Sequence, residues 1–412
     1  MRGRLITPAF ALVTASALSY FIGLGALIPV LPLYVEGDLD GSAFAVGVAV
    51  GAFAVTAAVL RPLVGRIGDR RGRRPLIVGG ALIVGASVLL YGVVESLAWL
   101  IVMRLLSGVG EAAVFVGAAT AAQDLAPRER RGEAASYFSI AIYGGLAIGP
   151  VLGETVRHAA GPSEVWLVSA VFCLLAAVLA IGIPSGLGGA EAGAPDGSLE
   201  HTAGGSFWRR YLHPAAIRPG FVLALATTGF AAFAAFLPLY VDQVGLATSG
   251  TVFAVYSVLV LAVRILGGRL PDRLGPIRAS TIALVLQAVG FVVLAAVPSV
   301  AGLYAGTVVY ALGVALHFPS LMRLVVDAAP ERERSHAVAT FTLFFDVAQG
   351  VGAAVLGVLV ALSGERAAFA ASAVLAVVAV VILRRNVAPG VGPITEDEAE
   401  LVDETVPDPL FD

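Results

Sequence analysis

The sequence has no lysine, one cysteine and few charged residues of any kind. Charged side chains make up 13% of the 412 residues and hydrophobic ones 58%, whereas soluble proteins carry about 25% charged residues. Such a composition excludes a disordered protein and an ordinary cytosolic enzyme. The lone cysteine, Cys173, excludes an intrachain disulfide and a cysteine metal cluster. The exclusive use of arginine is typical of a GC-rich genome, and we expect a prokaryotic source.

What the chain does contain is a series of apolar stretches near the ~20 residues needed to cross a bilayer. They predict twelve membrane helices, at about 8–35, 43–64, 75–94, 97–122, 134–156, 164–184, 217–241, 249–268, 278–297, 300–323, 336–361 and 366–385. The first stretch is too long for the apolar core of a signal peptide and is expected to be the first membrane helix. The sequence therefore predicts an all-α polytopic membrane protein.

The predicted helices fall into two groups of six. We expect an N-terminal bundle over residues 1–184, a cytoplasmic linker over 185–215, a C-terminal bundle over 216–386 and an acidic, disordered tail over 387–412. Most arginines gather on one side of the helices, and the positive-inside rule makes that side cytoplasmic. Both termini are therefore expected in the cytoplasm. We also expect the protein to lie in the cell membrane and to be a monomer.

Charged loops of the two groups resemble each other at a fixed spacing. The segment that begins DLAPRERR at Asp124 aligns with DAAPERER at Asp327, an offset of 203 residues, and the same offset relates Arg61 to Arg264. Shared apolar composition does not explain matches between charged loops. The sequence thus predicts a parallel repeat of two pseudo-symmetric six-helix bundles.

The connection between the second and third predicted helices carries the motif GRIGDRRGRR, from Gly65 to Arg74, and a partial copy contains Asp272 and Arg273. The motif closely resembles the signature of the major facilitator superfamily, which implies the major facilitator fold. The resemblance also implies a gating loop, in which Asp69 latches onto the start of the eleventh helix near Arg334. The residues assigned to this loop are Gly65, Asp69, Arg70, Gly72, Arg73, Asp272 and Arg273. The alternative is that these arginines only set the topology.

Two ionisable residues lie inside the fourth predicted helix. Arg104 and Glu111 share one helical face, with Glu111 near mid-depth. Burial disfavours a carboxylate and a nearby arginine favours it, so Glu111 is predicted to load and release a proton under the influence of Arg104. An arginine followed by Gly-x-Gly on this helix also resembles the superfamily's proton-linked motif. A static buried ion pair or hydrogen-bonded network is the alternative.

Further polar groups are candidates for lining a substrate cavity. Asp346 and Gln349 fall near the middle of the eleventh helix, where Asp346 can bind a cationic group or a second proton, or form only a hydrogen-bonded helix contact. The other candidates are aromatic: Tyr310, Tyr20 and Tyr256. Arg61 and Arg264 are expected to snorkel at the cytoplasmic helix ends, and His317 to be a packing histidine.

The fifth helix carries an arrangement of small residues and a proline. Gly145, Gly149, Pro150 and Gly153 resemble the antiporter motif of exporters in this superfamily, although Glu154 stands where a second glycine is expected. Small residues also allow ordinary close helix packing, so packing remains the alternative.

The resemblance extends to the drug:proton antiporter or arabinose-efflux-permease-like branch. It implies a secondary active transporter that exports a small amphipathic drug-like compound or metabolite in exchange for protons. The alternatives are a proton symporter importing a sugar or organic acid, and a membrane sensor that transports nothing. No Walker sequence or nucleophile motif is present, so we expect no enzyme activity, cofactor, metal or nucleic-acid partner. The expected partners are the substrate, protons and the lipid bilayer.

Overall fold

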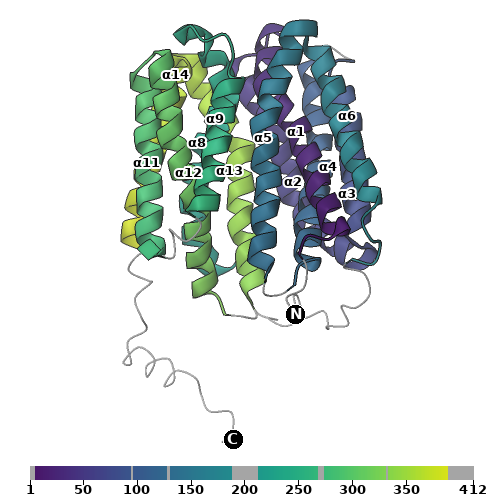
Figure 1. Cartoon of the computed structure of the whole chain (residues 1–412). Coiled ribbons are helices and arrows are strands. Elements are labelled where there is room, and N and C mark those ends of the chain that lie inside the picture. The colour runs from purple at the N-terminus through teal and green to yellow at the C-terminus, as the bar shows by residue number, and fades with distance from the viewer. Residues whose placement is uncertain are drawn as a thin grey trace, which may run out of the picture.

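A computed structural model describes residues 5–93, 96–127, 130–187, 212–267, 273–330 and 333–387. Within these ranges the chain forms twelve α-helices, which confirms the predicted fold class (Figure 1). The first six are α1 (Pro8–Gly37), α2 (Ala43–Arg71), α3 (Arg73–Leu89), α4 (Leu97–Asp124), α5 (Arg131–Ala160) and α6 (Pro162–Ile181). The second six are α8 (Pro214–Tyr240), α9 (Gly250–Leu266), α11 (Pro276–Ala296), α12 (Val300–Ala328), α13 (Arg334–Ser363) and α14 (Glu365–Ile382).

Ten of the described helices are long and apolar enough to cross a membrane, and α9 is a shorter apolar helix. The helices begin at sequence signals that favour helix starts. Thr7, Ser42 and Ser299 accept hydrogen bonds from the first turns of α1, α2 and α12, and prolines occupy the first turns of α6, α8 and α11. Residues 188–211 of the predicted linker and 388–412 of the predicted tail lie outside the described residues.

The second helix is longer than the sequence predicts. Instead of ending near residue 64, α2 continues to Arg71, so most of the predicted gating loop is helical. The chain turns only at Gly72, whose φ of +88° favours glycine. Arg61 therefore lies ten residues before the end of α2, at a depth of about 15 Å along the helix.

The two ends of the bundle differ in charge. The start of α1, the end of α14 and the connection between α2 and α3 lie at the same end, the lower one in Figure 1. We call this end the arginine-rich face, because Arg70, Arg71, Arg73 and the Arg384–Arg385 pair lie there. The other end, where the first turns of α6 and α14 carry Glu164 and Glu365, is the opposite face.

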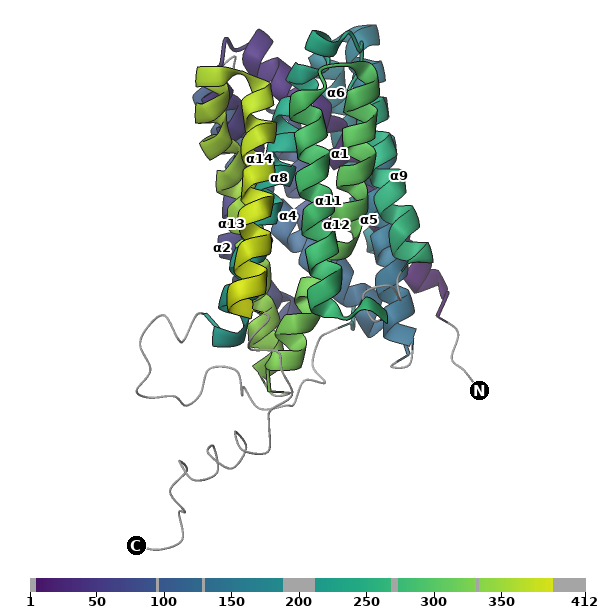
Figure 2. The ribbon, with the colours of Figure 1, turned by 90° about the vertical axis from the view of Figure 1, so that its left-hand side faces the viewer.

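Two helix pairs make the most extensive contacts between the halves, α2 with α13 and α5 with α9, and they lie on different sides of the bundle in Figure 2. Near the opposite face, α2 and α13 touch through glycines: a Cβ at Gly47 would overlap the backbone of Ala353, and a Cβ at Gly51 would overlap that of Gly350. A cluster of buried apolar side chains also runs from α1 and α6 across to α8 and α13. The halves are therefore closed at the opposite face.

Candidate functional site

A cavity of about 360 Å³ lies between the two halves. Side chains from α1, α2, α4 and α5 line it on one side, and side chains from α8, α9, α12 and α13 on the other. The lining is mostly apolar and aromatic, and it surrounds a small set of polar groups. Those with acidic, basic or amide side chains are Arg61, Arg104, Glu111, Arg264, His317, Asp346 and Gln349.

Arg61 holds two acids from different halves of the molecule. Its guanidinium lies 2.9 Å from an Asp346 carboxylate oxygen on α13 and 3.6 Å from a Glu111 oxygen on α4, and it stacks 4.9 Å from the centre of the Phe115 ring. We call these three charged residues the Arg61 triad. The expectation that Arg61 snorkels is wrong, because the continuation of α2 to Arg71 moves it away from the helix end.

The Arg61 triad carries more negative than positive groups. When both acids are ionised, two carboxylates face one guanidinium, which leaves one negative charge in excess. Both acids are almost fully buried, with side-chain exposures of 8% for Glu111 and 5% for Asp346. The second oxygen of Glu111 has no hydrogen-bond partner in the structure. Because an unpaired buried charge is costly, the triad favours the uptake of one proton or one cationic group.

Arg104 is held by the backbone rather than by Glu111. Its Nε donates to the carbonyl of Ala49 at 2.8 Å and one terminal nitrogen donates to that of Val50 at 2.9 Å. The guanidinium also stacks 4.6 Å from the centre of the Phe53 ring. The cation beside Glu111 is thus Arg61, and Arg104 fixes α4 to α2.

The predicted cavity residues divide into two groups. Asp346, Gln349 and Tyr256 line the cavity, whereas Tyr20 and Tyr310 are not among its lining residues. Tyr310 stacks behind Tyr256, with ring centroids 5.7 Å apart. The aromatic candidates thus extend from the cavity wall into the packing behind it.

Sequence reasoning missed the place of Arg264. This arginine was expected to snorkel, but it lines the cavity, with its guanidinium 4.7 Å from the centre of the Tyr143 ring on α5. The repeat relates it to Arg61, and each arginine stacks on an aromatic ring of the first half. The equivalence of these two positions in the repeat could therefore have indicated that both arginines line the cavity. His317 also lines the cavity, with Nδ1 3.1 Å from the Val314 carbonyl.

The antiporter-like glycines lie where α5 packs against α1 within the first half. A Cβ at Gly145 would lie 2.5 Å from that of Phe21, a Cβ at Gly149 would lie 2.5 Å from the Ile22 carbonyl oxygen, and one at Gly153 would overlap Ala26. Pro150 packs against α1 in the same way, because a Cβ at Gly25 would lie 3.2 Å from its Cδ. These positions support the packing interpretation of the motif.

Glu154, the residue that departs from the motif, bridges the halves at the opposite face. One carboxylate oxygen accepts hydrogen bonds from the Ser249 backbone N–H and hydroxyl, and the other accepts from the Gly250 N–H. Gly250 is the first residue of α9, so the carboxylate also faces the positive end of that helix.

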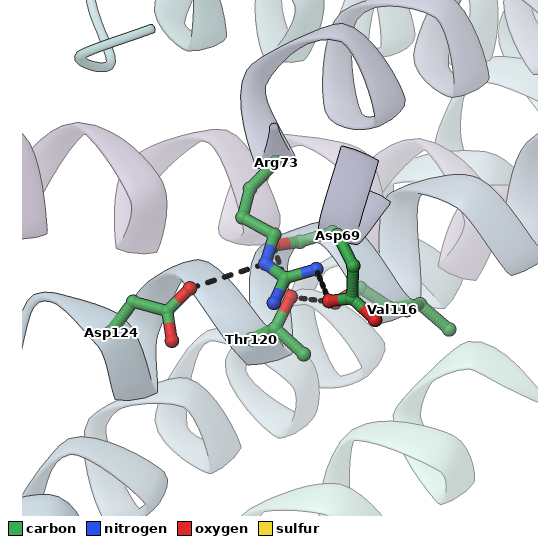
Figure 3. Close-up of polar contacts among 6 residues, drawn as sticks. Asp69, Arg73, Val116, Thr120 and Asp124 are labelled. Carbon is green, nitrogen blue, oxygen red and sulfur yellow. Dashed lines mark hydrogen bonds and ion pairs between the residues drawn. The ribbon is translucent and has the colours of Figure 1, made fainter. Parts of the chain in front are cut away.

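At the arginine-rich face, Arg73 connects two acids of the first half (Figure 3). Its guanidinium lies 2.7 Å from Asp69 at the end of α2 and 3.1 Å from Asp124 at the end of α4. Asp69 is 62% exposed, and among the described residues its partner is Arg73 rather than Arg334. The expected latch to α13 is therefore not made in this state.

The other gating residues of the motif differ in how closely they are packed. A Cβ at Gly65 would meet nothing within 4 Å, whereas one at Gly72 would lie 3.0 Å from the Ser185 carbonyl. Arg70 and Arg273 are exposed. Asp272 lies outside the described residues.

The twelve-helix fold and the charged cavity between its halves define a polytopic membrane transporter. The sequence profile described as Major Facilitator Superfamily matches residues 13–299 and 221–407. The chain belongs to the major facilitator superfamily. An uncharacterised transporter of this type from Salmonella typhimurium is 30% identical over 385 residues, which cover 91% of this chain and 96% of that protein.

Other similar proteins include one curated relative and two solved structures that share the fold. Multidrug resistance protein 1 of Bacillus subtilis is 36% identical over 163 residues, 39% of this chain and 41% of that protein. This match supports the resemblance to the drug-efflux branch. Among solved structures, a peptide transporter in complex with sulfate superimposes with a TM-score of 0.76 at 16% identity, covering 93% of this chain and 94% of that one. A bacterial homologue of the human lysosomal transporter Spinster, in an inward-facing and unoccupied conformation, gives 0.73 at 15% identity, covering 91% and 95%.

Proposed function

We propose that this protein exports a small amphipathic compound across the cell membrane in exchange for protons. The observation that carries the proposal is the Arg61 triad, in which a cation from α2 holds acids from both halves. The triad has one negative charge in excess, and either a proton or a positive group of the substrate can neutralise it. Competition for one site is the physical basis of exchange, since each ligand leaves when the other binds.

The triad also links binding to movement of the halves. The pair between Arg61 and Asp346 crosses from α2 to α13, so a proton on Asp346 weakens a contact between the two bundles. The other charged groups on the cavity are engaged differently: Arg104 binds carbonyls of α2, and Arg264 stacks on Tyr143. In this proposal the bundles of residues 1–184 and 216–386 rock to give alternating access.

The orientation in the membrane follows from the arginines. With the arginine-rich face in the cytoplasm, both termini are cytoplasmic and the closed opposite face is extracellular. The described contacts between the halves, through Gly47, Gly51 and Glu154, then seal the cavity from the outside. This arrangement supports an inward-facing state, ready to receive substrate from the cytoplasm.

Asp69 is proposed to act in the opposite state. When the arginine-rich face closes, Asp69 exchanges Arg73 for the start of α13. Because the Asp69 side chain is 62% exposed, loss of its pair with Arg73 costs about 0–1 kcal/mol. Asp69→Asn is thus expected to lower the transport rate while leaving the thermal unfolding midpoint nearly unchanged. A normal transport rate in this variant would remove Asp69 from the gate.

The test is transport by purified protein in liposomes with an imposed pH gradient. We expect the fluorescent cation ethidium to move in the direction opposite to the proton flow. We expect Glu111→Gln or Asp346→Asn to abolish the dependence of ethidium transport on the pH gradient. Glu133→Gln, at a surface pair with Arg130, is the matched control. Unchanged gradient dependence in both cavity variants contradicts the proposal. Movement of sugars or organic acids together with protons would instead support a symporter. The absence of any transport would support a sensor.

A further inference from the structure

The two arginines related by the repeat differ in their partners. Arg61 contacts two carboxylates, whereas none of the described carboxylates contacts Arg264. The Nε of Arg264 is buried and has no hydrogen-bond partner, and the aromatic ring of Tyr143 lies 4.7 Å from its guanidinium carbon. A ring face attracts a cation but accepts no charge-assisted hydrogen bond of the strength that a carboxylate provides.

Arg264 and the Arg61 triad lie on different walls of one cavity. The triad lies where α2 meets α13, and Arg264 lies where α9 meets α5. In Figure 2 the first helix pair is on the left and the second on the right. The cavity therefore has an excess negative charge within the triad on one wall and, on the other, a guanidinium that has no partner among the described carboxylates, while Arg104, the third arginine of the cavity, is bound by backbone carbonyls.

Apolar side chains occupy the wall between these two charged positions. Leu24 and Ile28 of α1 and Phe230 of α8 line the same cavity. Guanidinium groups bind carboxylates through two parallel hydrogen bonds and remain charged at any ordinary pH. A ligand that fits all three regions has an apolar body with a cationic group at one end and an anionic group at the other.

We propose that the substrate is a zwitterionic amphipathic molecule, with its ammonium group at the Arg61 triad and its carboxylate at Arg264. This inference rests on the proposed proton exchange, because the ammonium group is what competes with the proton. The carboxylate adds affinity, so simple cations such as ethidium still bind at the triad but more weakly than a zwitterion. It also makes a one-for-one exchange electrogenic, since a zwitterion leaves without net charge while a proton enters.

The experiment measures binding to the purified full-length protein in detergent, without any gradient. The probes are 6-(aminomethyl)-2-naphthoic acid, its methyl ester, which keeps only the cation, and its N-acetyl derivative, which keeps only the anion. We expect the wild-type protein to bind the zwitterion about tenfold more tightly than the ester, as one bond to a charged group provides. Arg264→Gln is expected to bind both equally, and Arg264→Lys to keep part of the preference. Arg323→Gln, at a surface pair with Asp327, should behave as wild type.

Two results would overturn the proposal. One is a wild-type protein that binds the ester as tightly as the zwitterion, or binds neither. The other is an Arg264→Gln variant that keeps the full preference. If that variant does not fold, the ranking of the three probes by the wild type and Arg264→Lys still decides. Gradient-driven efflux of the ester by wild type, without a preference for the zwitterion, would refute this inference and leave the proposed exchange intact.

Discussion

Glu154 of α5 accepts hydrogen bonds from both the backbone N–H and the hydroxyl of Ser249, at 2.7 and 2.6 Å. The two residues belong to different halves, and the glutamate is only 4% exposed. With the further bond from Gly250, one carboxylate makes three hydrogen bonds across the boundary between the bundles. The opposite face is thus closed by a polar contact beside α9 as well as by glycine packing beside α13.

Replacing this carboxylate should open the opposite face more often. Glu154→Gln exchanges one accepting oxygen for an amide nitrogen that cannot accept, and hydrogen bonds to charged groups contribute about 1.5–3 kcal/mol. We expect a cysteine introduced by Ser257→Cys to react about tenfold faster with an impermeant maleimide added outside the cells. Ser257 is buried on α9 and bonds to the Leu146 carbonyl across the boundary.

The background for this measurement is favourable. The native Cys173 is 1% exposed and should not react. Glu164→Gln changes an exposed acid of the same face and should leave the labelling rate unchanged. Equal rates in the Glu154 and Glu164 variants would show that the Glu154 contact does not hold the face closed.

The Arg61 triad should behave as an electrostatic unit in stability measurements. Arg61→Gln leaves two buried carboxylates unpaired, and breaking a buried ion pair in this way costs about 3–5 kcal/mol. We expect a lower thermal unfolding midpoint in detergent, recovered in large part by adding Asp346→Asn. Arg66→Gln, one turn and a half further along α2 and exposed, is the control. Purely additive losses in the double variant would contradict charge coupling within the triad.

The glycine contact between α2 and α13 should determine which face is open. At Gly51 a Cβ would overlap the Gly350 backbone, so Gly51→Ala is expected to disfavour the closed opposite face by about 1–3 kcal/mol. Spin labels at Phe44 and Leu362, which are 49% and 79% exposed, report the separation of the two helices by pulsed electron paramagnetic resonance. Longer distances should gain population in this variant. Gly79→Ala, where a Cβ meets nothing within 4 Å, should leave the distances as in wild type.

Two glycines of α5, Gly149 and Gly144, give a direct test of the packing interpretation. A Cβ at Gly149 would lie 2.5 Å from the Ile22 carbonyl oxygen and 2.7 Å from the Gly25 Cα, whereas one at Gly144 would lie 3.5 Å from Leu18. Gly149→Ala should therefore destabilise the protein by about 1–3 kcal/mol. Gly144→Ala should be neutral or slightly stabilising, because alanine favours helix. Thermal unfolding distinguishes the two, and similar midpoints would argue against tight packing between α1 and α5.

The fold was predictable because bilayer physics makes the sequence pattern simple. Apolar stretches of the right length and charged loops at a repeated offset indicate twelve helices in two related bundles, as found. The error came at a polar helix end. Since Gly65 to Arg71 resembles a loop in composition, nothing local indicated that α2 continues to Arg71, and the depth of Arg61 was misjudged by about 10 Å.

The cavity site was predictable only in part, and the reason differs from the one that hid the full length of α2. Buried charge identifies Glu111, Arg104 and Asp346 as residues of interest, and all three line the cavity. Which cation meets which acid depends on how α2, α4 and α13 pack, and a single sequence does not specify that packing. Arg104 binds carbonyl oxygens of α2, so the cation beside Glu111 is Arg61 instead. The coupling roles of these residues stay predictions.

The unbroken length of α2 has a mechanical consequence. Its 29 residues form a rod about 42 Å long, with Gly47 and Gly51 near one end, Arg61 beyond the middle and Asp69 near the other end. A stiff rod that tilts about its centre moves its two ends in opposite directions. In the proposed exchange, one lever would release the glycine seal at one face while it swings Asp69 toward the other half, with the Arg61 triad, the proposed proton site, beside the pivot.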